Sequence, residues 1–263
     1  MTKTNQQKVK DFLINNGVII VMFILVIYTG FTSDNFFTKN NFMNILMNMS
    51  SRLVIALGIA GCVITAGCDL SAGRMIGFGA CISGMLLQRM DYSGKFFPDM
   101  QPLNVFVVAL IAMLVCAAFG TVTGFFIAYL NVPPFIATLA MMEIVYGIGL
   151  IVTNATPLGG YVEQYTNVSN GKFLGINYLI WIAIIVAAIT WFIFNMTRHG
   201  KYMYAIGGNP QAAEVAGVPV KATLILIYMK AAAMYGLAGF MLGAKAGGAS
   251  VQTGYGYEME AIA

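Results

Sequence analysis

Charged residues are scarce in this 263-residue sequence: they make up 9% of the chain, against 59% hydrophobic residues. Soluble chains carry about 25% charged residues, which give them the polar surface that water requires. The shortage excludes a single soluble globule, because only the hydrocarbon core of a bilayer needs no such surface. Membrane lipid is therefore the expected surrounding of the chain.

Histidine and cysteine are too few and too dispersed for a metal centre. The sequence has one histidine, His199, and four cysteines without a CxxC pair: Cys62, Cys68, Cys81 and Cys116. All four cysteines lie in apolar stretches, where small packing residues are expected. Neither a zinc site nor a disulfide framework is predicted, and no motif implies a cofactor.

Basic clusters and catalytic constellations are lacking as well. The formal net charge is +4 and the Lys and Arg residues are scattered singly, so nucleic acid is not an expected partner. We find no set of Ser, His and Asp and no pair of carboxylates in one loop. The sequence therefore offers no catalytic residues and favours a protein that is not an enzyme.

Long apolar runs, by contrast, are abundant. Seven of them suit a bilayer crossing: residues 12–31, 46–66, 75–90, 103–130, 135–152, 178–196 and 222–242. They predict an all-α fold, a polytopic transmembrane helix bundle of about seven spans that forms one domain over residues 1–263.

Lys and Arg near the span ends predict the orientation, because these residues concentrate in cytoplasmic loops. The amino terminus is expected in the cytoplasm on account of Lys3, Lys8 and Lys10. Strict alternation then places the basic loop 198–221 on the same side. It leaves loops 91–102 and 154–177 outside, each with a single Lys.

Residues 64–74 place an acid and a base between two apolar runs. Asp69, Ser71 and Arg74 are the candidate residues for a translocation path, because charges at membrane depth are usually paired or beside water. Asp69 is also suited to cap the following helix, with Arg74 as its partner. An irregular break that lines the solute path and a plain cytoplasmic turn both fit this pattern.

Residues 198–221 are the least apolar stretch of the interior. Asn209 is suited to cap a short helix that has Pro210 at its first position, residues 211–216 as its body and Gly217 at its end. A small, rigid helix of this kind suits force transmission from a motor subunit. An ordinary interhelical loop is the alternative, and local chemistry alone favours it.

Glu143 and Lys230 are ionisable groups inside predicted spans. An ion pair between them, a proton relay, and groups that face water or a partner subunit are all compatible with the sequence. An ion-coupled secondary transporter, with Glu143 or Asp69 as the ion carrier, is therefore one alternative function. A membrane scaffold that transports nothing is another.

Residues 57–61, LGIAG, are similar to residues 235–239, YGLAG. The predicted topology places these segments in spans of opposite direction. Such a relation is what an inverted repeat in a transporter requires.

Several motifs together resemble the ribose and galactose class of binding-protein-dependent ABC permeases, and within it the galactose/methyl-galactoside group. They are TAGCDLSAGR after ALGIAG, NVPPFIATL, RHGKYMYAIGGNPQAAEVAGV, and the terminal YEMEAIA. The resemblance runs along essentially the whole chain. Members usually continue beyond this last motif, so the resemblance implies that the chain is truncated at its carboxyl end and that the inverted repeat is incomplete.

The resemblance implies a subunit of a bacterial inner-membrane importer for a monosaccharide. The expected partners are a second copy in a homodimer, an ATP-binding subunit that hydrolyses ATP, a periplasmic sugar-binding protein and membrane lipid. Within loop 198–221, the residues that correspond to the family's ATPase-coupling helix are Asn209, Pro210, Gln211, Ala212, Ala213, Glu214, Val215, Ala216, Gly217 and Val218.

Overall fold

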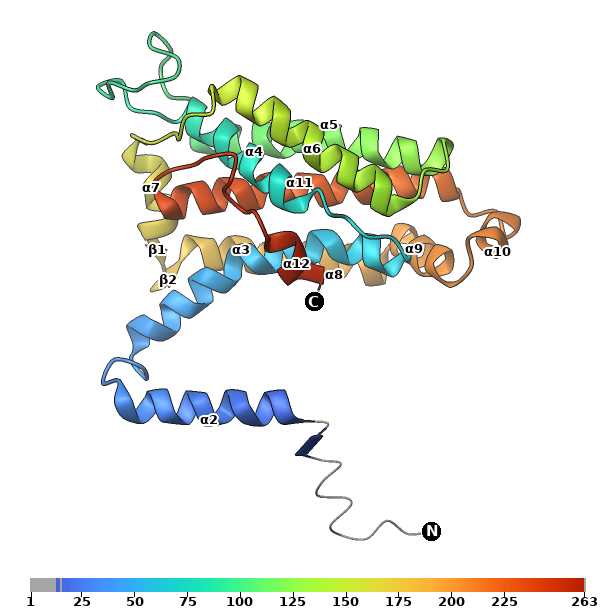
Figure 1. Ribbon diagram of the computed structural model, residues 1–263, viewed down its shortest axis with the longest axis horizontal. Helices are drawn as coiled ribbons and strands as arrows, with labels where there is room; N and C mark the ends of the chain where they lie inside the picture. The colour runs from blue at the N-terminus through green and yellow to red at the C-terminus, as the bar shows by residue number, and fades with distance from the viewer. Residues whose placement is uncertain (1–12, 15, 263) are drawn as a thin grey trace. The chain divides into compact units, whose positions relative to one another are not determined.

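The computed structural model describes residues 13–14 and 16–262, and this part of the chain is almost wholly helical. Its strands are the two-residue β1 (Lys172–Phe173) and β2 (Ile176–Asn177), which form an antiparallel pair. The helices in chain order are α2 (Gly17–Thr32), α3 (Lys39–Ile64), α4 (Ala72–Leu86), α5 (Val105–Tyr129), α6 (Pro134–Thr153), α7 (Glu163–Asn170), α8 (Tyr178–Met196), α9 (Arg198–Gly208), α10 (Pro210–Val215), α11 (Val220–Ala246) and α12 (Tyr257–Ile262) (Figure 1). The predicted all-α fold is confirmed. The lysines at positions 3, 8 and 10 and the start of the first predicted span at residue 12 lie outside the described residues.

Each of the seven predicted spans coincides with a helix, but the helices fall into two lengths. Within the described residues, five helices are long and apolar enough to cross a membrane: α3, α5, α6, α8 and α11. The other two, α2 and α4, are apolar but have only 16 and 15 residues. At 1.5 Å per residue, α4 is about 22 Å long, which is less than the roughly 30 Å of a hydrocarbon core. The prediction of seven full crossings is therefore too simple, and α4 begins earlier than expected, at Ala72.

The chain divides into two compact units, residues 1–46 and residues 47–263. The first contains α2 and the start of α3. Its helix α2 buries no residue, and Phe36 and Phe37 after it meet edge to face with ring centres 5.0 Å apart. The second unit contains the rest of α3 and all later elements, and every site below lies in it.

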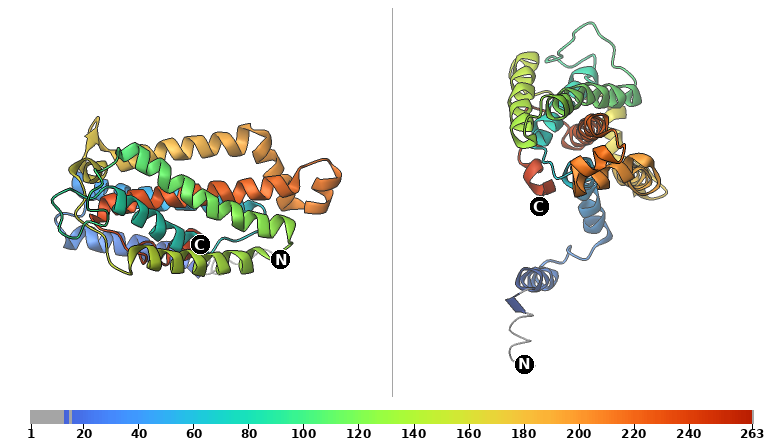
Figure 2. Two further views of the ribbon diagram at one scale, coloured as in Figure 1. Left: turned by 90° about the horizontal axis from the view of Figure 1, so that it is seen from above. Right: turned by 90° about the vertical axis from the view of Figure 1, so that its right-hand side faces the viewer.

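Helix α11 is the centre of the second unit, and it packs closely along α5 and α4 (Figure 2). Glycines make the close approach possible, as at membrane helix interfaces generally. A Cβ atom at Gly124 of α5 would lie 2.7 Å from the Cα of Ile225, and one at Gly79 of α4 would lie 2.9 Å from the Cα of Gly236. Larger residues at these positions would push the helices apart.

The two ends of the second unit have different architectures (Figure 1). At one end, the connections α4–α5, α6–α7 and α11–α12 meet. Gln88 of the first bridges to Tyr161 of the second, and Leu158 of the second bridges to Ala249 of the third. Helix α7 and the β1–β2 pair also lie there. At the opposite end, α9 and α10 connect α8 to α11. Bridges between segments far apart in the sequence characterise the first end, whereas two short consecutive helices characterise the second.

Candidate functional site

Residues 65–71 form an irregular segment inside the helix bundle. After α3 ends, the chain runs back along α11 before α4 begins (Figure 1). Tyr228 of α11 donates a long hydrogen bond of 3.5 Å to the carbonyl oxygen of Cys68, and Tyr235, two turns further along, reaches Asp69. Because Tyr235 lies near the middle of α11, the segment ends at mid-depth in the bundle and is not a surface turn.

Asp69 is 2% exposed and is held by hydrogen bonds from two residues. Its Oδ1 accepts bonds from the backbone N–H of Ser71 at 3.0 Å and from Ser71 Oγ at 2.6 Å. Its Oδ2 accepts a bond of 3.1 Å from the hydroxyl of Tyr235. The first of these bonds is an Asx turn that leads into α4, with Ser71 at the N-cap position. The structure therefore brings Asp69 and Ser71 together at the start of this helix.

Arg74 does not pair with Asp69, and the prediction of that pair is wrong. Both oxygens of Asp69 are already taken by Ser71 and Tyr235, and the guanidinium of Arg74 donates instead to Gln252, at 2.7 Å. Gln252 lies 178 residues further along the chain. The interaction could not be found from local spacing, although the glycine- and tyrosine-rich residues 252–257 after α11 were a signal of irregular backbone.

Glu143 and Lys230 lie on different surfaces and form no ion pair with each other. Glu143 is exposed near the middle of α6. Lys230 of α11 is half-buried and lines a small cavity of about 20 Å³ together with Thr190 and His199. The hydroxyl of Thr190 and Nε2 of His199 are buried there without a hydrogen-bond partner in the described part of the chain. The predicted alternative of an ion pair across the bundle is therefore wrong.

The predicted short helix of loop 198–221 is present as α10. Asn209 is its N-cap, and its side-chain oxygen accepts a hydrogen bond of 3.0 Å from the N–H of Ala212. Pro210 is the first helical residue, and Gly217 follows the helix with φ +83°. Local capping chemistry was sufficient to predict this element. The preceding helix α9 was not predicted, because its glycine- and tyrosine-rich sequence has no strong helical signal.

Ala213, one of the residues that correspond to the family's coupling helix, points inward. It is 5% exposed, whereas Val215 is 90% exposed and Glu214 is also exposed. A side chain at position 213 therefore packs against the rest of the loop, on the one side of α10 that is not exposed. The outer surface of α10 is formed by Gln211, Ala212, Glu214, Val215 and Ala216.

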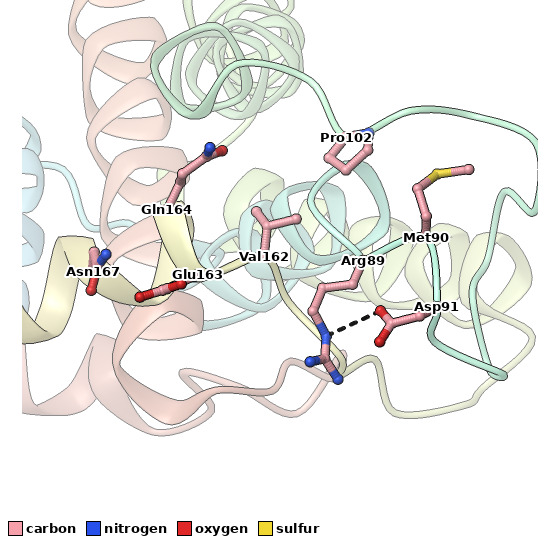
Figure 3. Close-up of a pocket in the computed structure, with 8 residues that line it drawn as sticks. All are labelled: Arg89, Met90, Asp91, Pro102, Val162, Glu163, Gln164 and Asn167. Carbon is pink, nitrogen blue, oxygen red and sulfur yellow. Dashed lines mark ion pairs between the residues drawn. The ribbon is translucent and has the colours of Figure 1, made fainter.

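A second cavity, of about 640 Å³, lies at the end of the bundle opposite α10. Figure 3 shows the side chains around it, among them Glu163 and Gln164 of α7 and the residues after α4. Arg89 Nε and Asp91 Oδ1 form an exposed ion pair of 3.6 Å at its rim. No local sequence pattern predicts this cavity, because its two walls come from loops about seventy residues apart.

The cysteines are free thiols, three of them buried in the core and Cys68 half-buried. Over the described ranges 13–14 and 16–262, no three His, Cys, Asp or Glu side chains gather as a metal site would require.

Five apolar helices of membrane-spanning length, with buried irregular backbone among them, define a multi-pass membrane protein. Residues 41–263 match the family described as branched-chain amino acid transport system / permease component, and the chain belongs to this permease family.

Relatives in the family include permeases named for sugars. The chain is 38% identical to the galactose/methyl galactoside import permease protein of Escherichia coli (strain K12), over 100% of this chain and 80% of the relative. It is 40% identical to the protein of that name in Haemophilus influenzae, with the same coverage. It is 31% identical to the ribose import permease protein of Escherichia coli (strain K12), over 97% of this chain and 77% of the relative. No solved structure matches the chain. The resemblance drawn from the motifs is confirmed.

Proposed function

We propose that this chain is the membrane-spanning subunit of an ATP-driven importer that moves galactose, a methyl galactoside or a similar monosaccharide across the bacterial inner membrane. One observation carries the proposal: identity of 38% and 40%, over the whole chain, to permeases named for galactose and methyl galactoside import. The 31% identity to a ribose permease supports the broader class of monosaccharide.

The proposed importer has three further components. A second copy of the permease completes the path, an ATP-binding subunit hydrolyses ATP, and a periplasmic sugar-binding protein delivers the solute. The permease itself catalyses no reaction in this scheme. It alternates between inward-open and outward-open packings, and the ATPase shifts the population between them.

The proposed path includes Asp69, Ser71 and Arg74. Irregular backbone at membrane depth is tolerated only where protein or a water-filled cavity surrounds it. The segment 65–71 meets this condition, because Asp69 and Ser71 are buried and Asp69 accepts a hydrogen bond from Tyr235 of α11. Arg74, in the first turn of α4, is only half-buried.

Residues 209–218, with α10 at their centre, are the proposed docking site of the ATPase. The N-cap bond of Asn209 makes the helix locally stable, and the exposure of Val215 and Glu214 leaves its outer surface available. In this proposal α10 and the amino terminus lie in the cytoplasm, and the cavity of about 640 Å³ beside Arg89 lies outside. Labelling of a cysteine introduced at Val215, in a variant without the native cysteines, tests this orientation. Reaction with an impermeant reagent added outside intact cells would contradict it.

The test of the function is uptake by the full-length permease reconstituted with its ATPase and binding protein. We expect uptake of radiolabelled galactose that requires ATP on the cytoplasmic side of the permease and the binding protein on the opposite side. Uptake that instead follows an imposed proton or sodium gradient without ATP would refute the proposal in favour of a secondary transporter.

A further inference from the structure

Arg74 is held between two tyrosine rings close to the start of α4. Its guanidinium carbon lies 4.0 Å from the centre of the Tyr146 ring and 4.4 Å from the centre of the Tyr255 ring. Its Nη1 donates a hydrogen bond of 2.7 Å to Gln252 Oε1, and Gln252 Nε2 donates one of 3.0 Å to the hydroxyl of Tyr146. These four residues are called the Arg74 cluster below.

The Arg74 cluster lies at membrane depth and yet is open at the surface of the second unit. Tyr146 is in the second half of the spanning helix α6, away from both of its ends, and Tyr255 is 63% exposed. Glu143, three residues before Tyr146 and therefore its neighbour on α6, is exposed as well. Hydrocarbon cannot solvate a guanidinium, an amide and a carboxylate side by side. This face therefore borders protein, water or polar solute, and not lipid, within the assembled transporter.

Arg74 has donors to spare. A guanidinium carries five N–H donors, and the described hydrogen bond to Gln252 uses one of them. The Nε atom is buried without a partner, and Arg74 forms no ion pair within the described residues. The described contacts of this cation are two aromatic faces and one amide, which leaves N–H donors for the oxygen atoms of a ligand.

The side chains of the cluster match the chemistry of a neutral sugar. Aromatic faces pack against the C–H groups of a pyranose or furanose ring, while guanidinium and amide groups hydrogen-bond to its hydroxyls. Because Gln252 bridges Arg74 and Tyr146, its amide fills the place where a hydroxyl would both accept from Arg74 and donate to Tyr146. A rotation of the exposed Gln252 side chain would release both groups without any change in the backbone.

We propose that Tyr146, Gln252 and Tyr255 form, together with Arg74, a contact site for a neutral monosaccharide on the translocation path, closed in this conformation by the Gln252 amide. The inference rests on the proposed import function and adds three residues that the sequence did not single out. Arg74 and Gln252 bind hydroxyls, and the two tyrosines bind the faces of the sugar ring.

The test compares two tyrosines of similar exposure in the reconstituted full-length transporter with its ATPase and binding protein. Tyr255→Leu removes an aromatic face from the cluster, whereas Tyr28→Leu removes a ring that is 66% exposed on α2, outside the cluster. Import of radiolabelled galactose and hydrolysis of ATP are both measured, and the ratio gives the ATP consumed for each sugar imported.

We expect Tyr255→Leu to lower import by about tenfold or more, the range for losing a well-placed contact with a charged or aromatic partner, while ATP hydrolysis continues. The ATP consumed for each sugar therefore rises. Tyr255→Phe keeps the ring and should lose less import than Tyr255→Leu, and Arg74→Lys should behave like Tyr255→Leu because it loses the planar array of donors. Tyr28→Leu should keep the unmodified ratio.

The outcomes separate this inference from the function on which it rests. If the unmodified transporter imports galactose with ATP but the ratio for Tyr255→Leu and Arg74→Lys equals that of Tyr28→Leu, the contact site is refuted and the import function stands. A parallel loss of import and hydrolysis in both cluster variants would also refute it, because that is the result of a structural role. If the unmodified transporter shows no ATP-driven import of galactose or ribose, both proposals fail.

Discussion

The hydroxyl of Tyr235 offers the sharpest test of how the bundle holds its irregular segment. It donates the hydrogen bond of 3.1 Å to Asp69 Oδ2, which receives no other described bond. Tyr235→Phe keeps the buried ring and leaves this oxygen without a partner, which costs about 1–3 kcal/mol. At about 2–4 °C for each kcal/mol, the midpoint of thermal unfolding should fall by about 2–12 °C.

Tyr228→Phe is the matched control, because Tyr228 is also buried on α11, two turns earlier, and its hydroxyl lies 3.5 Å from its acceptor. A bond of that length contributes little, so the midpoint should fall by clearly less than in Tyr235→Phe. Both variants are measured in the same detergent by tyrosine and tryptophan fluorescence on heating. Combining Tyr235→Phe with Asp69→Asn should give less than the sum of the separate losses, by about 0.5–3 kcal/mol. Equal midpoints for the two tyrosine variants, or strict additivity, would show that the Asp69 contact does not hold the segment.

Three further predictions concern other parts of the second unit. Val215→Asp should reduce co-purification of the ATPase without lowering the unfolding midpoint. Ala213→Trp should lower the midpoint, because overpacking at this buried position costs about 1–3 kcal/mol of stability. The reverse pattern would contradict the observed orientation of α10. Gly124→Ala should destabilise α5 against α11 by a similar amount, while Gly147→Ala, whose Cβ would meet nothing within 4 Å, should be neutral or stabilising on heating. Burial, and secondarily a neighbouring lysine, lower the pKa of His199 from 6.5 to about 4. As the pH falls, the unfolded chain therefore binds the proton first, and stability should fall as the pH drops from about 6.5 towards 4. His199→Gln should make the unfolding midpoint depend less on pH in this range. An unchanged slope would exclude His199 as the source of the pH dependence.

The helices and caps that depend on nearby residues could be predicted from the sequence. The apolar composition of α5 and α8 is sufficient to place both within a few residues. The cap of α10 is a property of Asn209 and Pro210 alone, and the structure shows it as expected. These features need no knowledge of the rest of the fold, because the hydrogen bonds and the hydrophobic effect that produce them act within one or two turns.

The features that the sequence did not reveal depend on contacts between distant segments. The Arg74 cluster joins α4, α6 and the segment after α11, and no local pattern relates these three. The burial of Ala213 depends on how α10 folds back on its neighbours, since an alanine suits an exposed and a buried position equally well. The early start of α4 follows from Asp69, whose partner Tyr235 lies 166 residues away.

The similarity between residues 57–61 and 235–239 has a counterpart in the structure that explains why the Arg74 cluster draws on both regions. The first segment lies in α3 and the second in α11, two long helices that run in opposite directions (Figure 1). Each is followed by non-helical chain that returns into the bundle and by a short helix, α4 or α12.

The non-helical stretch after α11 meets the first turn of α4, the helix that follows the other stretch. A Cβ at Gly73 would lie 2.8 Å from the carbonyl oxygen of Gly254, so the two backbones are in direct contact. A buried acid accepts backbone hydrogen bonds at each of these places: Asp69, in the first stretch, accepts from Ser71, and Glu258, in the first turn of α12, accepts from Gly256. Each acid thus satisfies backbone N–H groups where helical hydrogen bonding is interrupted, and protein rather than lipid surrounds both interruptions. Arg74 follows the first stretch, in the first turn of α4, and Gln252 lies in the second stretch. Any displacement of α3 and α4 against α11 and α12 therefore changes the distance between these two residues. A contact site built from both helix pairs, α3 with α4 and α11 with α12, would therefore change its affinity for solute as the pairs move. Such a change is the requirement for alternating access.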